Sequence, residues 1–302
     1  MDAISRDAIS QAYEQILQRF VDWALGQADI RAALVIGSRA RQLDHPADEF
    51  ADLDLILFCT DTQTYLSQAG WIEAMGEPWL TFVEATGDGS QLERRVLYDG
   101  GLDVDFALVP MGVVQESAEQ GLPPAFIDIV QRGVRLLVDK DNLFTDLPAM
   151  SGLRQPQTPP TQAEFLQAVN DFWYHAVWSA KHLRRGELWW AKGCIDVHLK
   201  YLLQRMLEWH AQAMHGPGYD TWLRGRFLEE WADPRALAEL RQCFGHYDSD
   251  NLWLALFATM RLFRWLMEGT AQKLNIAYAQ SGIDAAAMLV HKLYDEKLAS
   301  NF

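Results

Sequence analysis

Hydrophobic residues in the first half of the chain recur with two different periods. In residues 4–24 they follow the spacing of a helix that packs on one face. Short apolar runs with the length and composition of strands occur at 32–36, 53–58, 79–84, 94–98, 102–109 and 134–138, and a second helix is expected at 124–132. This mixture of short strands and helices predicts a mixed α/β domain.

The pattern changes after residues 148–161, a stretch rich in Pro, Gly, Ser, Thr and Gln that is typical of a linker. Beyond it, apolar residues follow helical spacing. Helices are expected at 162–185, 187–213, 222–231, 234–244, 251–279 and 283–298. The chain is therefore predicted to be an α+β protein, with a first domain at 1–147, a linker at 148–161 and an all-helical bundle of about five helices at 162–302.

Charge is distributed unevenly between the two halves. The net charge is −15, and residues 1–150 account for all of it, with 25 acidic against 10 basic residues. The negative electrostatic field of this half repels nucleic acid and attracts cations. A nucleic-acid partner is therefore not expected, and a cationic small molecule is favoured as the partner.

Cysteine and histidine usage gives no sign of a metal-stabilised or disulfide-bonded fold. The three cysteines are widely spaced, and the histidines lack ligand spacing with carboxylates; those considered are His175, His182, His198 and His246. No signal peptide and no apolar run long enough to span a bilayer is seen. A cytoplasmic protein without a membrane partner is expected.

The most informative motif follows the first predicted strand. Gly37, Ser38 and Arg39 form an expected turn leading into a short helix, and backbone amides at such a point bind phosphate. Asp52 and Asp54 come shortly afterwards, at the start of the next strand. Residues i and i+2 of a strand share a face, so these carboxylates would lie side by side and require a cation. Mg²⁺, completed by nucleotide phosphates, suits such hard oxygen ligands.

A third carboxylate is expected on the strand at 102–109. Asp103 and Asp105 share one face of this strand, and Asp105 lies deeper in the apolar run. If this strand pairs with the one at 53–58, Asp105 is the better candidate to complete the metal site. Three carboxylates on adjacent strands favour phosphoryl or nucleotidyl transfer.

These residues resemble a known family. Gly-Ser, Asp-x-Asp and a distal Asp form the pattern of the polymerase-β-like nucleotidyltransferases. The segments at 37–39, 48–54 and 103–110 are similar to the aminoglycoside 6-adenylyltransferases, also called streptomycin adenylyltransferases. In the helical half the resemblance continues at 172–173, 180–187, 205–209, 251–253 and 262–264, so it covers nearly the whole chain.

The resemblance implies an enzyme that moves AMP from ATP to a hydroxyl of a streptomycin-like aminoglycoside and releases pyrophosphate. Asp52, Asp54 and Asp105 would hold Mg²⁺, and Asp105 would also help to deprotonate the attacking hydroxyl. The β- and γ-phosphates would be held by Gly37, Ser38 and Arg39.

Two lysines of the helical half are further candidates. Lys181 and Lys192 would reach the triphosphate, and the alternative for each is a solvated helix charge.

Two other functions remain open at this point. The same adenylyl transfer could serve another small acceptor, such as a lincosamide, a metabolite or a nucleotide. The chain could also be a nucleotide-binding regulatory module without turnover, although the presence of all three aspartates and Ser38 argues against that.

Overall fold

The computed structural model describes residues 6–87, 89–114, 122–153 and 158–300. Contacts divide the chain into two units, Met1–Gln155 and Pro156–Phe302. The boundary falls within the segment predicted to be a linker. The 3₁₀ turn η2 (Leu147–Met150) at the start of that segment belongs to the first unit, because Leu147 is buried in its core.

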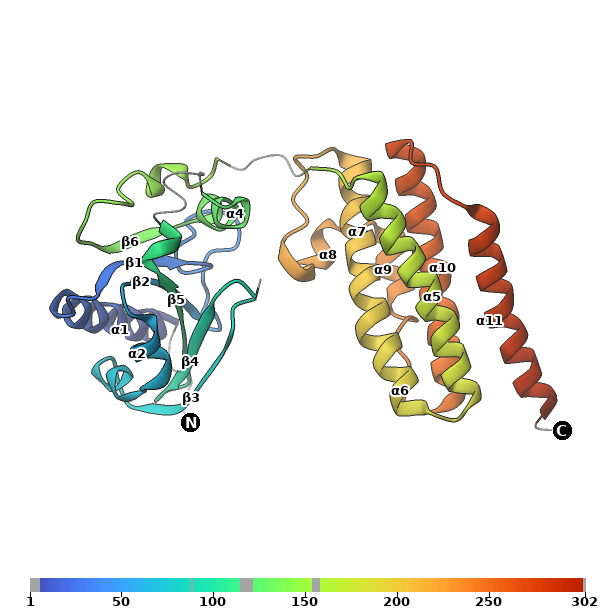
Figure 1. The fold of residues 1–302 in the computed structure, drawn as a ribbon, viewed down its shortest axis with the longest axis horizontal. Coiled ribbons are helices and arrows are strands. Elements are labelled where there is room, and N and C mark those ends of the chain that lie inside the picture. The colour runs from blue at the N-terminus through green and yellow to red at the C-terminus, as the bar shows by residue number, and fades with distance from the viewer. Residues whose placement is uncertain (1–5, 88, 115–121, 154–157, 301–302) are drawn as a thin grey trace. The chain divides into compact units, whose positions relative to one another are not determined.

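The first unit is built on a mixed sheet of six strands, in the order β3-β4-β5-β2-β1-β6 (Figure 1). The strands are β1 (Ile30–Ile36), β2 (Leu53–Cys59), β3 (Pro78–Ala85), β4 (Leu92–Tyr98), β5 (Leu102–Pro110) and β6 (Arg135–Asp139). β2 and β5 run parallel, and the other neighbouring pairs are antiparallel. The mixed sheet expected from the sequence is confirmed.

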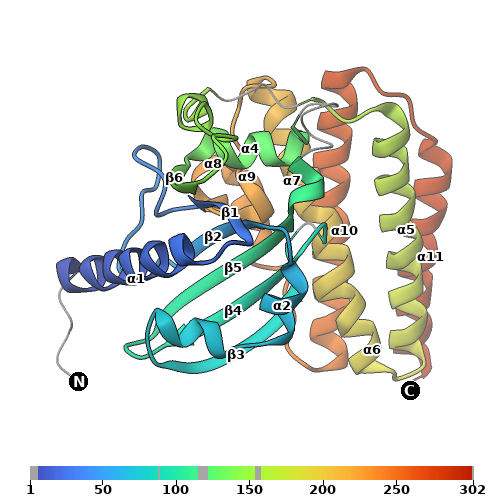
Figure 2. The same ribbon diagram turned by 60° about the vertical axis from the view of Figure 1, so that its left-hand side comes forward.

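Both faces of the central strands are covered, which explains why β1 and β2 are almost continuously apolar. Helix α1 (Arg6–Gly26) packs on one face of the sheet (Figure 2). Its Leu17 and Phe20 share a core with Leu55 of β2. Helix α4 (Pro124–Arg132) and η2 cover the other face, in a smaller core with Ile56. Helix α2 (Thr62–Ser67) and the 3₁₀ turn η1 (Gly70–Ala74) follow β2.

The second unit contains helices α5 (Gln162–Arg184), α6 (Leu188–Gly193), α7 (Leu199–His215), α8 (Leu228–Trp231), α9 (Pro234–Leu240), α10 (Ser249–Leu274) and α11 (Gln280–Ser300). A π-helical turn, η3 (Cys194–His198), joins α6 to α7, and a 3₁₀ turn, η4 (Leu223–Gly225), precedes α8. One core unites the long helices, so the predicted all-helical second half is confirmed. Among the helices of the described ranges, none has both the length and the apolar character needed to span a bilayer.

The largest difference from the predicted helices lies at 222–231. Instead of one helix, the chain forms η4 and α8, because Trp222, Arg224 and Phe227 adopt left-handed backbone conformations with φ of 52°, 58° and 55°. The Asp220 side chain accepts a hydrogen bond from the Trp222 backbone N–H at 3.1 Å, which favours a turn over a helix. Helix α10 also ends before the predicted 279, because Asn275 is left-handed.

Phe172→Ala tests the core of the helical unit. Phe172 is fully buried and stacks on Phe263, with ring centroids 3.7 Å apart. Removing the ring should lower the free energy of unfolding by about 3–5 kcal/mol. Tyr174→Ala, an exposed aromatic on the same helix, should cost less than about 0.5 kcal/mol. Urea unfolding followed by circular dichroism measures both, and equal losses would contradict this packing.

Candidate active site

The parallel pairing of β2 and β5 brings three carboxylates together. In this register Asp54 lies opposite Asp105, and Asp52 precedes Asp54 by two residues on the same side of the chain. One ligand oxygen from each of the three lies within 4.8 Å of the others. A neighbouring candidate from the sequence, Asp103, is exposed. Three hard oxygen donors at this separation suit a divalent cation such as Mg²⁺.

Burial perturbs the pKa of Asp105. Asp105 is only 8% exposed, and this burial raises the pKa of its carboxyl from 3.8 to about 6. The positive charge of Arg95 acts to lower this pKa, whereas the negative charges of Glu93, Asp52 and Asp103 raise it further. A carboxylate with a pKa near neutrality is suited to accept a proton at physiological pH.

Arg95 is a part of the site that the sequence reasoning missed. It pairs with Asp105 across β4 and β5, and its guanidinium lies 3.3 Å from the Asp105 carboxylate. The same guanidinium contacts Glu84 at 2.6 Å and Glu93 at 3.0 Å. It therefore neutralises part of the acidic charge around Asp105. Only the register of β4 against β5 identifies this role, and that register cannot be read from the sequence.

Position 37 in the turn must be glycine because the backbone there lies very close to the Asp54 carboxylate. Gly37 has a φ of +71°, and a Cβ at this position would lie 2.1 Å from Asp54 Oδ2. Only a residue without a side chain leaves room for the carboxylate.

Ser38 provides an unsatisfied polar atom beside this contact. Its Oγ is buried and has no hydrogen-bond partner among the residues that the structure describes. A buried hydroxyl without a protein partner is uncommon, and it retains the capacity to form a hydrogen bond with a ligand or a water molecule.

The short helix expected after this turn is absent, so that prediction is wrong. The chain makes a single turn, in which the Ala40 N–H donates to Gly37 O and the Arg41 N–H to Ser38 O, each at 3.2 Å. Asp44 and His45 then adopt left-handed conformations, and the next residue, Pro46, disfavours helix before it. Any phosphate contacts here would come from turn amides rather than from a helix N-terminus.

Arg39 contacts the protein rather than projecting freely from the turn. Its guanidinium donates to Ala51 O at 2.6 Å and lies 3.4 Å from the centre of the Tyr13 ring. It thus fixes the backbone immediately before Asp52. The predicted phosphate contact of Arg39 stays a prediction.

The two lysines predicted to bind nucleotide lie in the second unit. Lys181 is exposed on α5. Lys192, on α6, is paired with Asp196 and donates to Gly245 O at 2.8 Å. The structure groups Gly37, Ser38, Asp52, Asp54 and Asp105 around the turn, and the roles of both lysines stay predictions.

Comparison with known proteins identifies the family. A family model described as streptomycin adenylyltransferase matches residues 11–291. The chain belongs to the streptomycin adenylyltransferase family. It is therefore an enzyme of the nucleotidyltransferase class.

Known members of this family are distant in sequence but similar in length. An aminoglycoside 6-adenylyltransferase from Bacillus subtilis (strain 168) is 23% identical over 273 residues, which cover 88% of this chain and 92% of that protein. One from Campylobacter jejuni is 22% identical over 294 residues, or 95% and 93% of the two chains. A crystal structure of an aminoglycoside 6-adenyltransferase from Bacillus subtilis aligns with a TM-score of 0.44 and 21% identity over 93% of this chain and 98% of that one.

Gly37→Ala tests the contact between the turn and Asp54 in the candidate metal site. The added Cβ should displace the Asp54 carboxylate and weaken Mg²⁺ or Mn²⁺ binding by about tenfold or more. Gly100→Ala is the matched control, since Gly100 also has a positive φ, +82°, but no atom within 4 Å of the added Cβ. Both variants should lose stability through backbone strain, and isothermal titration calorimetry should show weaker metal binding in Gly37→Ala alone. Equal affinities would contradict the assigned role of Gly37.

Asp105→Asn should stabilise the metal-free protein. The folded state raises the pKa of Asp105 from 3.8 to about 6. Between these two pH values the folded protein keeps a proton on Asp105 that the unfolded chain has released. The free energy of unfolding therefore falls as the pH rises from about 4 to 6. Asparagine has no such ionisation, so the variant should gain about 2 kcal/mol at about pH 7.5 in EDTA and little near pH 4. Urea unfolding at both pH values measures the difference, with the exposed Asp103→Asn as control. No gain at the higher pH would contradict the burial penalty.

Proposed function

We propose that this protein transfers AMP from ATP to a hydroxyl of a streptomycin-like aminoglycoside in a Mg²⁺-dependent reaction that releases pyrophosphate. The observation that carries the proposal is the cluster of Asp52, Asp54 and Asp105 beside the Gly37–Ser38 turn. Family membership supports the adenylyl transfer. The aminoglycoside acceptor is supported by the relatives named aminoglycoside 6-adenylyltransferase.

The residues present fit a bound Mg²⁺. Asp52, Asp54 and Asp105 supply hard oxygen ligands from two adjacent strands. The absence of a Cβ at Gly37 leaves space for the Asp54 carboxylate, and the buried Ser38 hydroxyl has hydrogen-bonding capacity to spare. When bound, Mg²⁺ supplies positive charge that offsets the charge of the triphosphate.

The protein's own groups then have distinct tasks. Ser38 Oγ and the amides of the turn hold phosphate oxygens by hydrogen bonds. Asp105 accepts the proton of the acceptor hydroxyl, whose oxygen forms a bond to the α-phosphorus. The bond from that phosphorus to the bridging oxygen breaks, and pyrophosphate leaves with the electron pair. Arg95 keeps Asp105 oriented through the contact at 3.3 Å. Catalysis on this scheme is mainly positioning and charge neutralisation.

Two further observations support the acceptor class and the compartment. The acidic excess of residues 1–150 favours a polycationic acceptor over a neutral one. The three cysteines, Cys59, Cys194 and Cys243, are free thiols, which supports a reducing cytoplasm as the site of action.

Adenylylation assays with Asp54→Asn test this function. With ATP and a panel of streptomycin, spectinomycin, kanamycin and lincomycin, mass spectrometry should detect AMP added to streptomycin. Asp54→Asn removes a metal-ligand charge while leaving the fold intact, and should lower turnover by about 1,000-fold. Asp99→Asn, in the exposed turn between β4 and β5, is the matched control and should retain wild-type turnover.

Three outcomes would overturn the proposal in different ways. Pyrophosphate release at wild-type rates in EDTA would contradict the metal dependence. Modification of lincomycin alone would keep the chemistry and change the acceptor. ATP binding without modification of any compound would indicate a regulatory module.

A further inference from the structure

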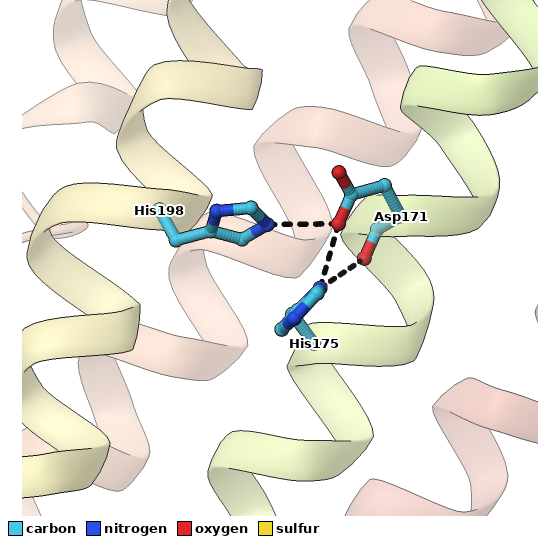
Figure 3. Close-up of side chains that lie close together, drawn as sticks. All are labelled: Asp171, His175 and His198. Carbon is cyan, nitrogen blue, oxygen red and sulfur yellow. Dashed lines mark hydrogen bonds and ion pairs between the residues drawn. The ribbon is translucent and has the colours of Figure 1, made fainter.

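A second cluster of metal-ligating side chains lies within the helical unit. Asp171 and His175 project from α5, and His198 reaches them from η3 (Figure 3). Asp171 Oδ1 lies 2.6 Å from His175 Nδ1 and 2.8 Å from His198 Nε2. The prediction that the histidines lack ligand spacing with carboxylates is wrong for His175 and His198, which share Asp171, and for His182, which pairs with Glu187. The signal was present in part, since Asp171 and His175 are separated by one helical turn.

Two local features of the backbone create this arrangement. Helix α5 is fixed at its start by a capping box between Thr161 and Glu164, and it carries Asp171 and His175 on one face. His198 is the last residue of η3, where the Leu199 N–H bonds to Cys194 O in place of the usual α-helical acceptor. Such π turns add one residue to a helix and occur frequently at functional sites. Here the turn places the imidazole of His198 beside Asp171.

We propose that Asp171, His175 and His198 bind a divalent transition-metal ion such as Zn²⁺. Two imidazole nitrogens and one carboxylate form a donor set that favours Zn²⁺ over Mg²⁺, unlike the three carboxylates of the first unit. One ligand atom from each residue lies within 4.8 Å of the others. The site supplies three protein ligands, which leaves one position of a tetrahedral ion for water.

The present geometry is close to that of a bound ion. Zn²⁺ held at about 2.0–2.1 Å from each donor places neighbouring donors roughly 3.3 Å apart. The two nitrogen–oxygen distances of 2.6 and 2.8 Å must therefore lengthen by about 0.7 and 0.5 Å, shifts that small side-chain rotations provide. The side chains of Asp171, His175 and His198 are 25%, 32% and 39% exposed, so an ion can enter from solvent.

Binding at this site would link two core elements of the helical unit. α5 contributes two ligands, and the segment between α6 and α7 contributes the third. An ion held by the folded state alone stabilises that state, because the unfolded chain does not hold His198 beside Asp171 and His175. We therefore expect Zn²⁺ to raise the melting temperature of the helical unit whether or not the enzyme turns over.

Zinc titration of the full chain, after EDTA treatment and dialysis, tests the proposal. Isothermal titration calorimetry should detect a Zn²⁺ site that persists in Asp54→Asn, which disrupts the cluster of the first unit. Asp171→Asn and His198→Gln retain hydrogen-bonding groups but lose a ligand, and should weaken this site by about tenfold to 100-fold. His182→Gln is the matched control, since His182 lies on the same helix in a pair with Glu187, and it should bind Zn²⁺ like the wild type.

Two results would overturn the proposal. One is the same Zn²⁺ affinity in His198→Gln and His182→Gln, and the other is no zinc binding in Asp54→Asn. A spectroscopic measurement on the unaltered protein covers the case in which a variant fails to fold. In proton NMR spectra, Zn²⁺ should shift the imidazole resonances of His175 and His198, and unchanged resonances of both would contradict the site.

Discussion

The pairing of β2 with β5 is the constraint on which the first unit depends. This parallel register places Asp54 opposite Asp105, so like charges are held together at one end of the sheet and one of them is buried. Such an arrangement opposes folding unless cations compensate for it. Apolar cores on both faces supply the stability that permits it. The candidate active site thus destabilises the folded state locally, and the packing of the rest of the sheet offsets this destabilisation.

Several neighbouring residues offset or accommodate the repulsion between these carboxylates. Arg95 reduces the charge around Asp105. Gly37 leaves space for the Asp54 carboxylate, and Arg39 holds the backbone before Asp52 through Ala51. These contacts fix the carboxylates before any ligand arrives. Preorganisation of this kind is what transfer of a charged group requires, because the protein then reorganises little during the reaction.

The sequence predicted the strands, the change to helices and the aspartates, because these depend on local periodicity and spacing. It failed where contacts between distant segments decide the outcome. Arg95 joins the site only through strand register, and His198 meets Asp171 only through the fold of the helical unit. The left-handed residues around Arg224 break a segment whose apolar spacing alone is helical. Local signals therefore indicated the acids of the candidate site but not the groups that contact them.

The π turn at Cys194–His198 has a consequence for variation among related sequences. The turn accommodates one extra residue within an otherwise continuous helix, so deleting one residue there would restore regular α-helix and leave the phase of α7 nearly unchanged. The buried face of α7, which includes Leu202, Leu203 and Met206, would stay directed at its core. Deleting a residue from the regular part of α7 would instead rotate the remainder by about 100°. A change of length by one residue is therefore tolerated better at this turn than in the α-helices on either side of it.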